Sequence, residues 1–301
     1  MSLMRPVLNL MLRLFEQPYL ARVNEPADVR ASFDRKARLM FRSPRGTRCE
    51  WDDLGGVRAL RVCHGQAQGD AQILYLHGGA YVFGSPRSHQ GIAGQMSRLT
   101  GLPVWLPHYR LAPEHPFPAA LDDALAACRA MPSPVIIAGD SAGGGLALAL
   151  LARICAEGLP QPLMTISFSP FADMTYSGGS IKSNARAEVM LPVRRLEELR
   201  EMYLQGADPR DPRCSPLFAD FKGAGPVVMT ASDSEILRDD ARRMAARLRG
   251  QGVAADLIEG RGLPHAWPYF HPILPEARAT LRDIAARIAR VIPPSSPQSG
   301  S

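Results

Sequence analysis

The feature with the clearest chemical meaning is a serine between two glycines, in the run Gly139-Asp140-Ser141-Ala142-Gly143. An apolar run at residues 135–138 precedes it, and a helical stretch rich in alanine and leucine follows it. A Gly-x-Ser-x-Gly pattern between a strand and a helix places the serine on a sharp, strained turn with its hydroxyl exposed. Gly139 and Gly143 fit because side chains there would collide as strand and helix close up. The competing interpretation, a phosphate-binding turn, is disfavoured because the chain has no G-x-x-x-x-G-K-[ST] pattern.

A glycine-rich loop, His77-Gly78-Gly79-Ala80, follows a second apolar run at residues 74–76. Attack of a serine on a carbonyl creates an oxyanion, which needs backbone N–H donors that are already in place. A loop of this kind supplies such donors, and the residue after the nucleophile supplies another. The candidate oxyanion-hole residues are Gly78, Gly79, Ala80 and Ala142. We interpret His77 as a structural residue that holds the loop. Taken alone, the loop is also compatible with an ordinary tight turn.

A nucleophilic serine requires a base, and the base requires an acid that orients it. On a strand–turn–helix elbow the chain order is serine, then acid, then histidine. Only His265 and His271 follow Ser141. His265 comes after an expected strand at 255–258 and a glycine-containing loop, so we expect it at the carboxyl edge of the sheet, as the base. His271 precedes a proline and the last helical stretch, and we expect it on the surface.

The acid should lie in the loop after an expected strand at residues 227–230. The acidic side chains there are Asp233, Glu235, Asp239 and Asp240. The last two fall in the first turn of the next helix, where the helix dipole stabilises negative charge. Asp233 also suits the N-cap of that helix. Position alone leaves Asp233 and Glu235 open.

Strand-like and helix-like segments alternate along most of the chain. The expected strands are 58–62, 72–76, 103–106, 135–138, 164–168, 227–230 and 255–258. Helical stretches at 119–131, 143–157, 236–250 and 275–292 lie between or after them. This alternation predicts an α/β fold with a central, mostly parallel sheet flanked by helices. Unbroken apolar runs such as 135–138 are typical of strands that are buried on both faces.

The segments outside this alternation predict a helical cap. Residues 1–50 read as N-terminal cap helices, and residues 51–292 as the catalytic domain. An insertion at 174–221, with helical spacing followed by several prolines, is expected to join the cap. Residues 293–301 are expected to be a flexible tail, because they are rich in proline and serine.

The first helical stretch is amphipathic. One of its faces carries apolar side chains, and we expect that face to pack on the body of the protein. Its members are Val7, Leu10, Met11, Leu14 and Phe15. Arg13 and Glu16 interrupt the apolar run, which is not the pattern of a signal peptide. No run reaches the length of a membrane span, so we expect a cytoplasmic protein without membrane insertion.

Composition argues against several other classes of protein. The chain has 301 residues, 46% of them hydrophobic, which is sufficient for one large domain. Its formal net charge is +6, but the basic residues are scattered and are not interleaved with aromatics, so we expect no nucleic-acid binding. The five cysteines contain no C-x-x-C pair, which argues against a disulfide framework or a structural zinc site. We expect neither a metal nor an organic cofactor.

Together, these motifs resemble the hormone-sensitive-lipase family of esterases, also called bacterial family IV. Residues 77–80 resemble the family's H-G-G-G loop, and residues 139–144 resemble its G-D-S-A-G-G elbow. Residues 109–120 are similar to a long family stretch, and residues 265–268 to its histidine loop. The resemblance covers the chain from about residue 74 to residue 268. It implies an α/β-hydrolase fold with a helical cap.

The resemblance also implies roles for the site residues. The family motif D-x-L-x-D, laid on residues 235–239, places the catalytic acid on Glu235 and leaves Asp233 as the runner-up. Gly79 and Ala80 would donate to the oxyanion, together with Ala142. Ala80 stands where the family has a third glycine. A methyl group leaves the N–H in place if φ stays negative, so we expect the oxyanion hole to survive.

The activity that this resemblance implies is that of a serine carboxylesterase, acting on short- to medium-chain acyl esters through a Ser-Glu-His triad and an acyl-enzyme. The same triad would serve an amidase or deacetylase, and some relatives of the fold bind small molecules without catalysis. A homodimer through an edge strand or a late helix is compatible with the family. Apolar cap residues are expected either to line the substrate pockets or to pack between cap and body. These residues are Phe15, Phe33, Met190, Leu191 and Tyr203.

Overall fold

The computed structural model describes residues 2–66, 70–132 and 134–292, so the expected tail at 293–301 lies outside the described residues. The strands are β1 (Thr47–Leu54), β2 (Val57–His64), β3 (Gln72–Leu76), β4 (Val104–Pro107), β5 (Val135–Asp140), β6 (Met164–Phe168), β7 (Val227–Ser232) and β8 (Ala255–Gly260). They form one sheet in the order β1-β2-β4-β3-β5-β6-β7-β8. The pairs β1–β2 and β2–β4 are antiparallel and the other pairs are parallel. The predicted fold class is confirmed.

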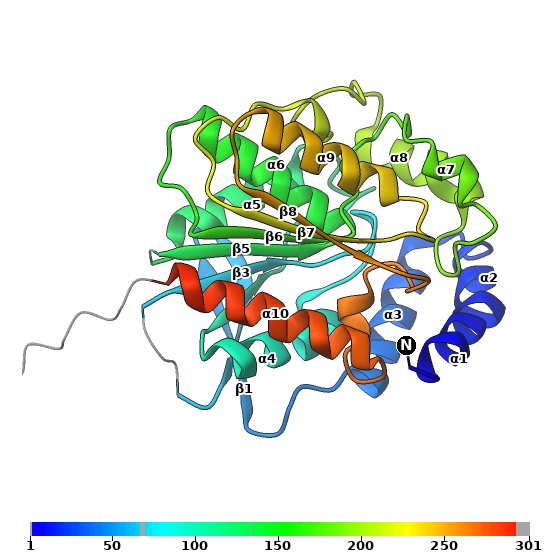
Figure 1. The fold of residues 1–301 in the computed structure, drawn as a ribbon, viewed down its shortest axis with the longest axis horizontal. Coiled ribbons are helices and arrows are strands. Elements are labelled where there is room, and N and C mark those ends of the chain that lie inside the picture. The colour runs from blue at the N-terminus through cyan, green and yellow to red at the C-terminus, as the bar shows by residue number, and fades with distance from the viewer. Residues whose placement is uncertain (1, 67–69, 133, 293–301) are drawn as a thin grey trace, which may run out of the picture.

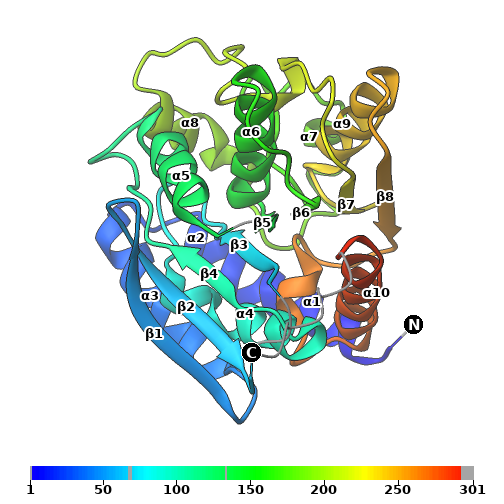
Figure 2. The same cartoon turned by 90° about the vertical axis from the view of Figure 1, so that its left-hand side faces the viewer.

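Helices cover both faces of this sheet. The longer ones are α3 (Pro26–Met40), α4 (Pro86–Thr100), α5 (Ala119–Ala130), α6 (Ala142–Ala156), α9 (Arg238–Gly250) and α10 (Pro275–Val291). Helices α5, α6 and α9 lie on one face, whereas α4 and α10 lie on the other (Figures 1 and 2). The insertion contributes α7 (Ser180–Ser183), a 3-10 turn (Val193–Arg195), α8 (Leu196–Leu204) and a second 3-10 turn (Pro216–Phe218).

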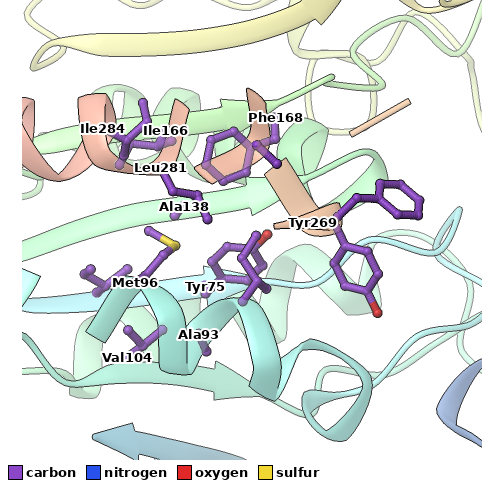
Figure 3. Packing of buried hydrophobic residues seen from close by; sticks show 14 of the residues in the cluster. Tyr75, Ala93, Met96, Val104, Ala138, Ile166, Phe168, Tyr269, Leu281 and Ile284 are labelled. Atoms are coloured by element: carbon purple, nitrogen blue, oxygen red, sulfur yellow. The ribbon is translucent and has the colours of Figure 1, made fainter. Parts of the chain in front are cut away.

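The central strands are apolar on both sides because each side faces a helical layer. In β3, Ile73 and Tyr75 join the cluster beneath α4 and α10, whereas Leu74 and Leu76 join the cluster beneath α5 and α6. Figure 3 shows the first cluster, in which Tyr75 and its neighbours pack against side chains of α4 and α10. Successive residues of a strand point to opposite faces, so the side chains of a buried parallel strand are mostly apolar on both faces.

The first strand, β1, was not predicted from the sequence. Its residues are mostly polar and exposed, because β1 is the edge of the sheet and pairs only with β2. An edge strand with one open side does not need the apolar run that marks a central strand. The sheet therefore begins at Thr47, before residue 51, where we placed the boundary of the catalytic domain.

The N-terminal helices differ from the prediction in how they pack. They are α1 (Met4–Met11), a π-helical turn (Leu12–Glu16) and α2 (Gln17–Leu20). The five apolar side chains that we expected to pack on the body are each at least 50% exposed, and that prediction is wrong. Leu8 and Leu12 are buried instead. The apolar side chains cover a wide part of the helix surface, and only the side that carries Leu8 and Leu12 contacts the body. Within the described ranges, no helix is both long and apolar enough to cross a membrane.

Candidate active site

Ser141 stands on the turn between β5 and α6, as its sequence context predicted. Its backbone has φ 54° and ψ −121°, a conformation that non-glycine residues rarely adopt and that must be held by its surroundings. The Ser141 N–H donates to the carbonyl of Phe168, at 2.8 Å. A Cβ on Gly139 would lie 2.3 Å from the carbonyl oxygen of Gly143, and a Cβ on Gly143 would lie 2.1 Å from that of Leu76. The steric reason that we gave for both glycines is therefore correct.

Three side chains from distant parts of the chain form one line of hydrogen bonds. His265 Nε2 lies 2.8 Å from Ser141 Oγ, and His265 Nδ1 lies 2.7 Å from Glu235 Oε2. His265 and Glu235 are each 1% exposed. Burial alone would lower the pKa of His265, but the hydrogen bond to Glu235 and the charges of Glu235, Glu188 and Asp140 outweigh it, so the pKa is raised above its usual 6.5. This arrangement lets Nε2 accept the hydroxyl proton of Ser141 while a buried carboxylate stabilises the imidazolium.

The geometry separates the two acids that position had left open. The carboxylate of Glu235 accepts hydrogen bonds from Ser169 Oγ (2.8 Å) and the Ser232 N–H (2.7 Å), in addition to its contact with His265. Asp233 is exposed, and its carboxylate accepts from the Gly262 N–H at 2.7 Å. Asp239, the third candidate, pairs with Arg238. Glu235 is therefore the carboxylate that orients the histidine in this structure.

Two insertion residues that the sequence analysis did not single out hold the acid loop, which we define as residues 233–237. Asn184 Nδ2 donates to the carbonyls of Asp233 and Glu235, both at 2.8 Å. Glu188 accepts from the Ile236 N–H at 3.2 Å, and its other oxygen accepts from the backbone N–H of Met190 at 2.8 Å. Burial raises the pKa of the Glu188 carboxyl. No motif marks these residues, because their role depends on a contact between segments about fifty residues apart.

The glycine loop offers fewer free donors than we expected. The Gly78 N–H donates to Asp140 Oδ1 (3.1 Å) and also faces His89 Nε2 (3.3 Å), so it is occupied. No hydrogen bond to another described residue engages the N–H groups of Gly79 or Ala80. Ala142 is the first residue of α6, where the N–H has no partner within the helix. These three groups remain as candidate oxyanion donors.

The conformation of Ala80 differs from the condition under which we expected the oxyanion hole to survive. Its φ is +54°, not negative, so the loop retains a left-handed backbone although the glycine has been replaced. An alanine in that region carries a strain of about 1 kcal/mol. Asp140 accepts from the Tyr75 hydroxyl at 2.9 Å as well as from Gly78, and this buried contact helps to hold the loop in place.

Within the described residues, the other two histidines of interest, His77 and His271, make no hydrogen bond to Ser141. His77 stacks on Tyr109 with 4.2 Å between ring centroids, and burial lowers its pKa to about 3, so it is a neutral structural residue. His271 is 5% exposed, so its predicted surface position is wrong. Burial lowers the pKa of His271 to about 4. The turn before it, Trp267–Phe270, contacts α4, where the Tyr269 hydroxyl donates to the carbonyl of Ser88 at 3.0 Å.

Ser141 and His265 open into an apolar pocket between the body and the helical segments. Its wall includes Leu20, Val29, Phe33, Phe83, Met190, Leu191, Leu199, Met202 and Tyr269. Of the five cap residues proposed from the sequence, Phe33, Met190 and Leu191 line this pocket. Phe15 is exposed, and Tyr203 is a core residue stacked on Tyr81. In the part of the chain that the structure covers, no three His, Cys, Asp or Glu side chains gather as a metal site.

Known proteins share both the sequence and the architecture of this chain. A family profile described as "alpha/beta hydrolase fold" matches residues 73–269. An acetyl-hydrolase of Streptomyces hygroscopicus is 39% identical over 215 residues, which cover 69% of this chain and 72% of that protein. An esterase of Acinetobacter venetianus is 33% identical over 239 residues, which cover 77% and 78%.

Solved structures agree with these relatives. The crystal structure of EstE5 soaked with ethyl alcohol superposes with a TM-score of 0.92 at 34% identity, over 97% of this chain and 99% of that one. An esterase from the bacterial hormone-sensitive lipase family superposes with a TM-score of 0.91 at 34% identity, over the same shares. The chain therefore belongs to the hormone-sensitive-lipase family of α/β-hydrolases and is a carboxylic ester hydrolase.

Proposed function

We propose that the protein is a serine carboxylesterase in which Ser141, His265 and Glu235 form the catalytic triad. The observation that carries this proposal is the line of hydrogen bonds from Ser141 Oγ through the imidazole to Glu235, with distances of 2.8 and 2.7 Å. His265 takes the hydroxyl proton as Oγ attacks the ester carbonyl. The N–H groups of Gly79, Ala80 and Ala142 receive the oxyanion.

Collapse of the tetrahedral intermediate releases the alcohol, which takes its proton from His265, and leaves an acyl group on Ser141. Water then attacks the acyl-enzyme, with His265 again acting first as base and then as acid. No step requires a metal or organic cofactor. Activity depends on a neutral His265 and should therefore rise with pH through its raised pKa.

The substrate class that we propose is short- to medium-chain acyl esters. The pocket at Ser141 is lined mostly by apolar side chains, which suits an acyl chain. One relative is named an ethyl acetate hydrolase, and crystals of EstE5 were soaked with p-nitrophenyl butyrate. Residues 1–46, which precede β1, and the insertion at 174–221 act as the cap over this pocket in our proposal.

Hydrolysis of p-nitrophenyl esters from acetate to palmitate, by the wild type and by Ser141→Ala, tests the proposal. We expect a maximum at a short or medium chain, and no activity in Ser141→Ala. A maximum at palmitate would contradict the substrate class. Hydrolysis of p-nitroanilides in preference to esters would favour the alternative, an amidase or deacetylase with the same triad. Inactivity on every substrate would favour a relative that only binds small molecules.

Two further expectations concern the setting of the enzyme. The five cysteines are free thiols, which supports the expected cytoplasmic compartment. Strand β8 ends the sheet, so its open edge is the place where we propose that a homodimer would form.

A further inference from the structure

The exposed apolar side chains of this protein gather at one place. Among the described residues, nine large hydrophobic side chains are 44–85% exposed, and all lie between residues 3 and 40. Seven belong to the first helical stretch and two to the end of α3. They are Leu3, Met4, Val7, Leu10, Met11, Leu14, Phe15, Leu39 and Met40, which we call the N-terminal apolar face. Scattered single residues need no explanation, but a patch of this size marks an interaction surface.

The helix that carries most of this face is fixed to the body by the side next to the face. Leu8 and Leu12 are buried there. Asn9 donates to the carbonyl of Gly262 at 2.9 Å, and Arg13 donates to the carbonyl of Arg186 at 2.8 Å. The helix therefore does not need the N-terminal apolar face for its own attachment, and turning over would break these contacts.

The N-terminal apolar face continues inward to the catalytic pocket. A groove between α1 and α3 starts at exposed residues of the face, Met4, Met11 and Met40. Its inner end is lined by Phe33, Met190, Tyr269 and Phe270, and the same four residues line the pocket that holds Ser141. A lipophilic molecule on the face would thus meet mostly apolar side chains on the way to the pocket wall, and the charged side chains in the lining, Glu16 and Lys36, are paired with each other.

The charge of the same segment identifies the partner. Residues 1–45 contain nine Lys or Arg and four Asp or Glu, so their net charge of +5 makes up nearly all of the +6 of the chain. The exposed basic residues beside the face are Arg38, Arg42 and Arg45, which line one hollow together with Leu39 of the face. A twofold dimer through this face would bring these charges against their own copies. An anionic lipid surface instead complements both the charge and the apolar side chains.

We propose that the N-terminal apolar face docks the protein on anionic lipid surfaces, with the first helix lying in the headgroup region and the groove opening toward the lipid. Binding of this kind is peripheral and needs no membrane-spanning segment. It extends the proposed function by presenting the catalytic pocket to lipophilic esters held in a membrane. The docking itself does not depend on the ester preference.

Sedimentation with vesicles of phosphatidylcholine, with and without phosphatidylglycerol, tests the proposal directly. The wild type should bind the anionic vesicles, less at high salt, and leave pure phosphatidylcholine largely unbound. The triple variant Leu3→Ser/Leu10→Ser/Leu14→Ser should bind at least tenfold more weakly, because each exposed leucine loses its burial in lipid. These three side chains line neither the groove nor the pocket, so hydrolysis of p-nitrophenyl acetate in solution should be unchanged and reports correct folding.

A matched pair of charge variants distinguishes binding through the N-terminal apolar face from attraction by the overall charge of the protein. Arg38→Gln/Arg42→Gln, at exposed positions beside Leu39, should weaken binding roughly tenfold, since each basic residue near the surface contributes substantially. Arg282→Gln/Arg290→Gln removes the same charge from exposed positions on α10 and should change binding little. Equal loss in both double variants, or no binding by the wild type at low salt, would overturn the proposal.

Sedimentation velocity tests the competing possibility that a second copy of the chain binds to the N-terminal apolar face. The wild type and the triple leucine variant should show the same oligomeric state. A wild-type dimer that the triple variant converts to monomer, without vesicle binding, would make the face a self-interface and overturn lipid docking. Because ester hydrolysis in solution is measured separately, failure of the docking proposal remains distinct from failure of the proposed function.

Discussion

Replacing Glu235 with glutamine is the sharpest perturbation of the triad, because the surroundings of the carboxylate determine how the amide must point. Glu235 Oε1 accepts from two donors, Ser169 Oγ and the Ser232 N–H. In Glu235→Gln the amide oxygen must stay with these donors, and the NH₂ group must then face His265 Nδ1. A donor at that place forces Nδ1 to be the acceptor and puts the ring proton on Nε2. His265 then cannot accept the proton of Ser141.

The expected loss follows from this change of tautomer. The substitution preserves side-chain volume, so packing should survive, while the base is blocked and the imidazolium loses its carboxylate. A triad disabled in this way loses about 10⁴-fold in kcat, which corresponds to about 5.5 kcal/mol of transition-state stabilisation. Initial rates on p-nitrophenyl butyrate measure kcat and kcat/KM, and thermal unfolding by circular dichroism confirms that the variant is folded.

Asp233→Asn is the matched control. It also exchanges a carboxylate for an amide in the same loop, but at an exposed residue whose oxygen can still accept from the Gly262 N–H. A surface change of this kind should alter kcat by no more than about threefold. If Glu235→Gln kept more than about a tenth of the wild-type kcat, or if Asp233→Asn fell as far, the assignment of the acid would be refuted.

Three other substitutions test neighbouring parts of the site. Because the charge of Glu188 helps to raise the pKa of His265, Glu188→Gln should move the acidic limb of the kcat/KM profile to lower pH, and an unmoved limb would contradict this. Gly143→Ala would place a Cβ 2.1 Å from a backbone oxygen of β3. This variant should therefore lose about 4 kcal/mol or more of stability. The control Gly250→Ala, where the added Cβ meets open space, should melt like the wild type. Equal melting temperatures for the two variants would show that the elbow is not crowded. Asn184→Ala removes two hydrogen bonds from the acid loop and should lower the free energy of unfolding by about 2 kcal/mol. An unchanged midpoint of urea unfolding would show that Asn184 does not hold this loop.

What could be predicted from the sequence depended on local constraints. The apolar runs of the central strands reflect burial on both faces, and the steric crowding at Gly139 and Gly143 follows from the elbow itself. These features need only a few adjacent residues, and they were predicted correctly. Strand β1 was not predicted because an edge strand can be as polar as a loop. Its pairing with β2 follows from the tight turn between the two strands.

Features that depend on distant segments could not be predicted in the same way. Position left Glu235 and Asp233 open, the family motif favoured Glu235, and the contact with His265 distinguishes their side chains in the structure. The two hydrogen bonds from Asn184 likewise form only after the insertion has folded over the acid loop. The apolar face of the first helix was identified correctly as a face, but periodicity does not tell whether such a face meets the protein or the solvent. The +54° φ of Ala80 shows that the loop imposes its conformation on whatever residue stands there.

Covalent labelling with phenylmethylsulfonyl fluoride tests most directly whether Ser141 is the nucleophile and His265 its base. The reagent sulfonylates a serine only where a neighbouring base activates the hydroxyl. We predict complete inactivation with one adduct per chain, located by peptide mass spectrometry on the peptide that contains Ser141, and greatly slowed labelling in His265→Ala. Inactivation with the adduct on another residue, or equal labelling of His265→Ala, would contradict the account.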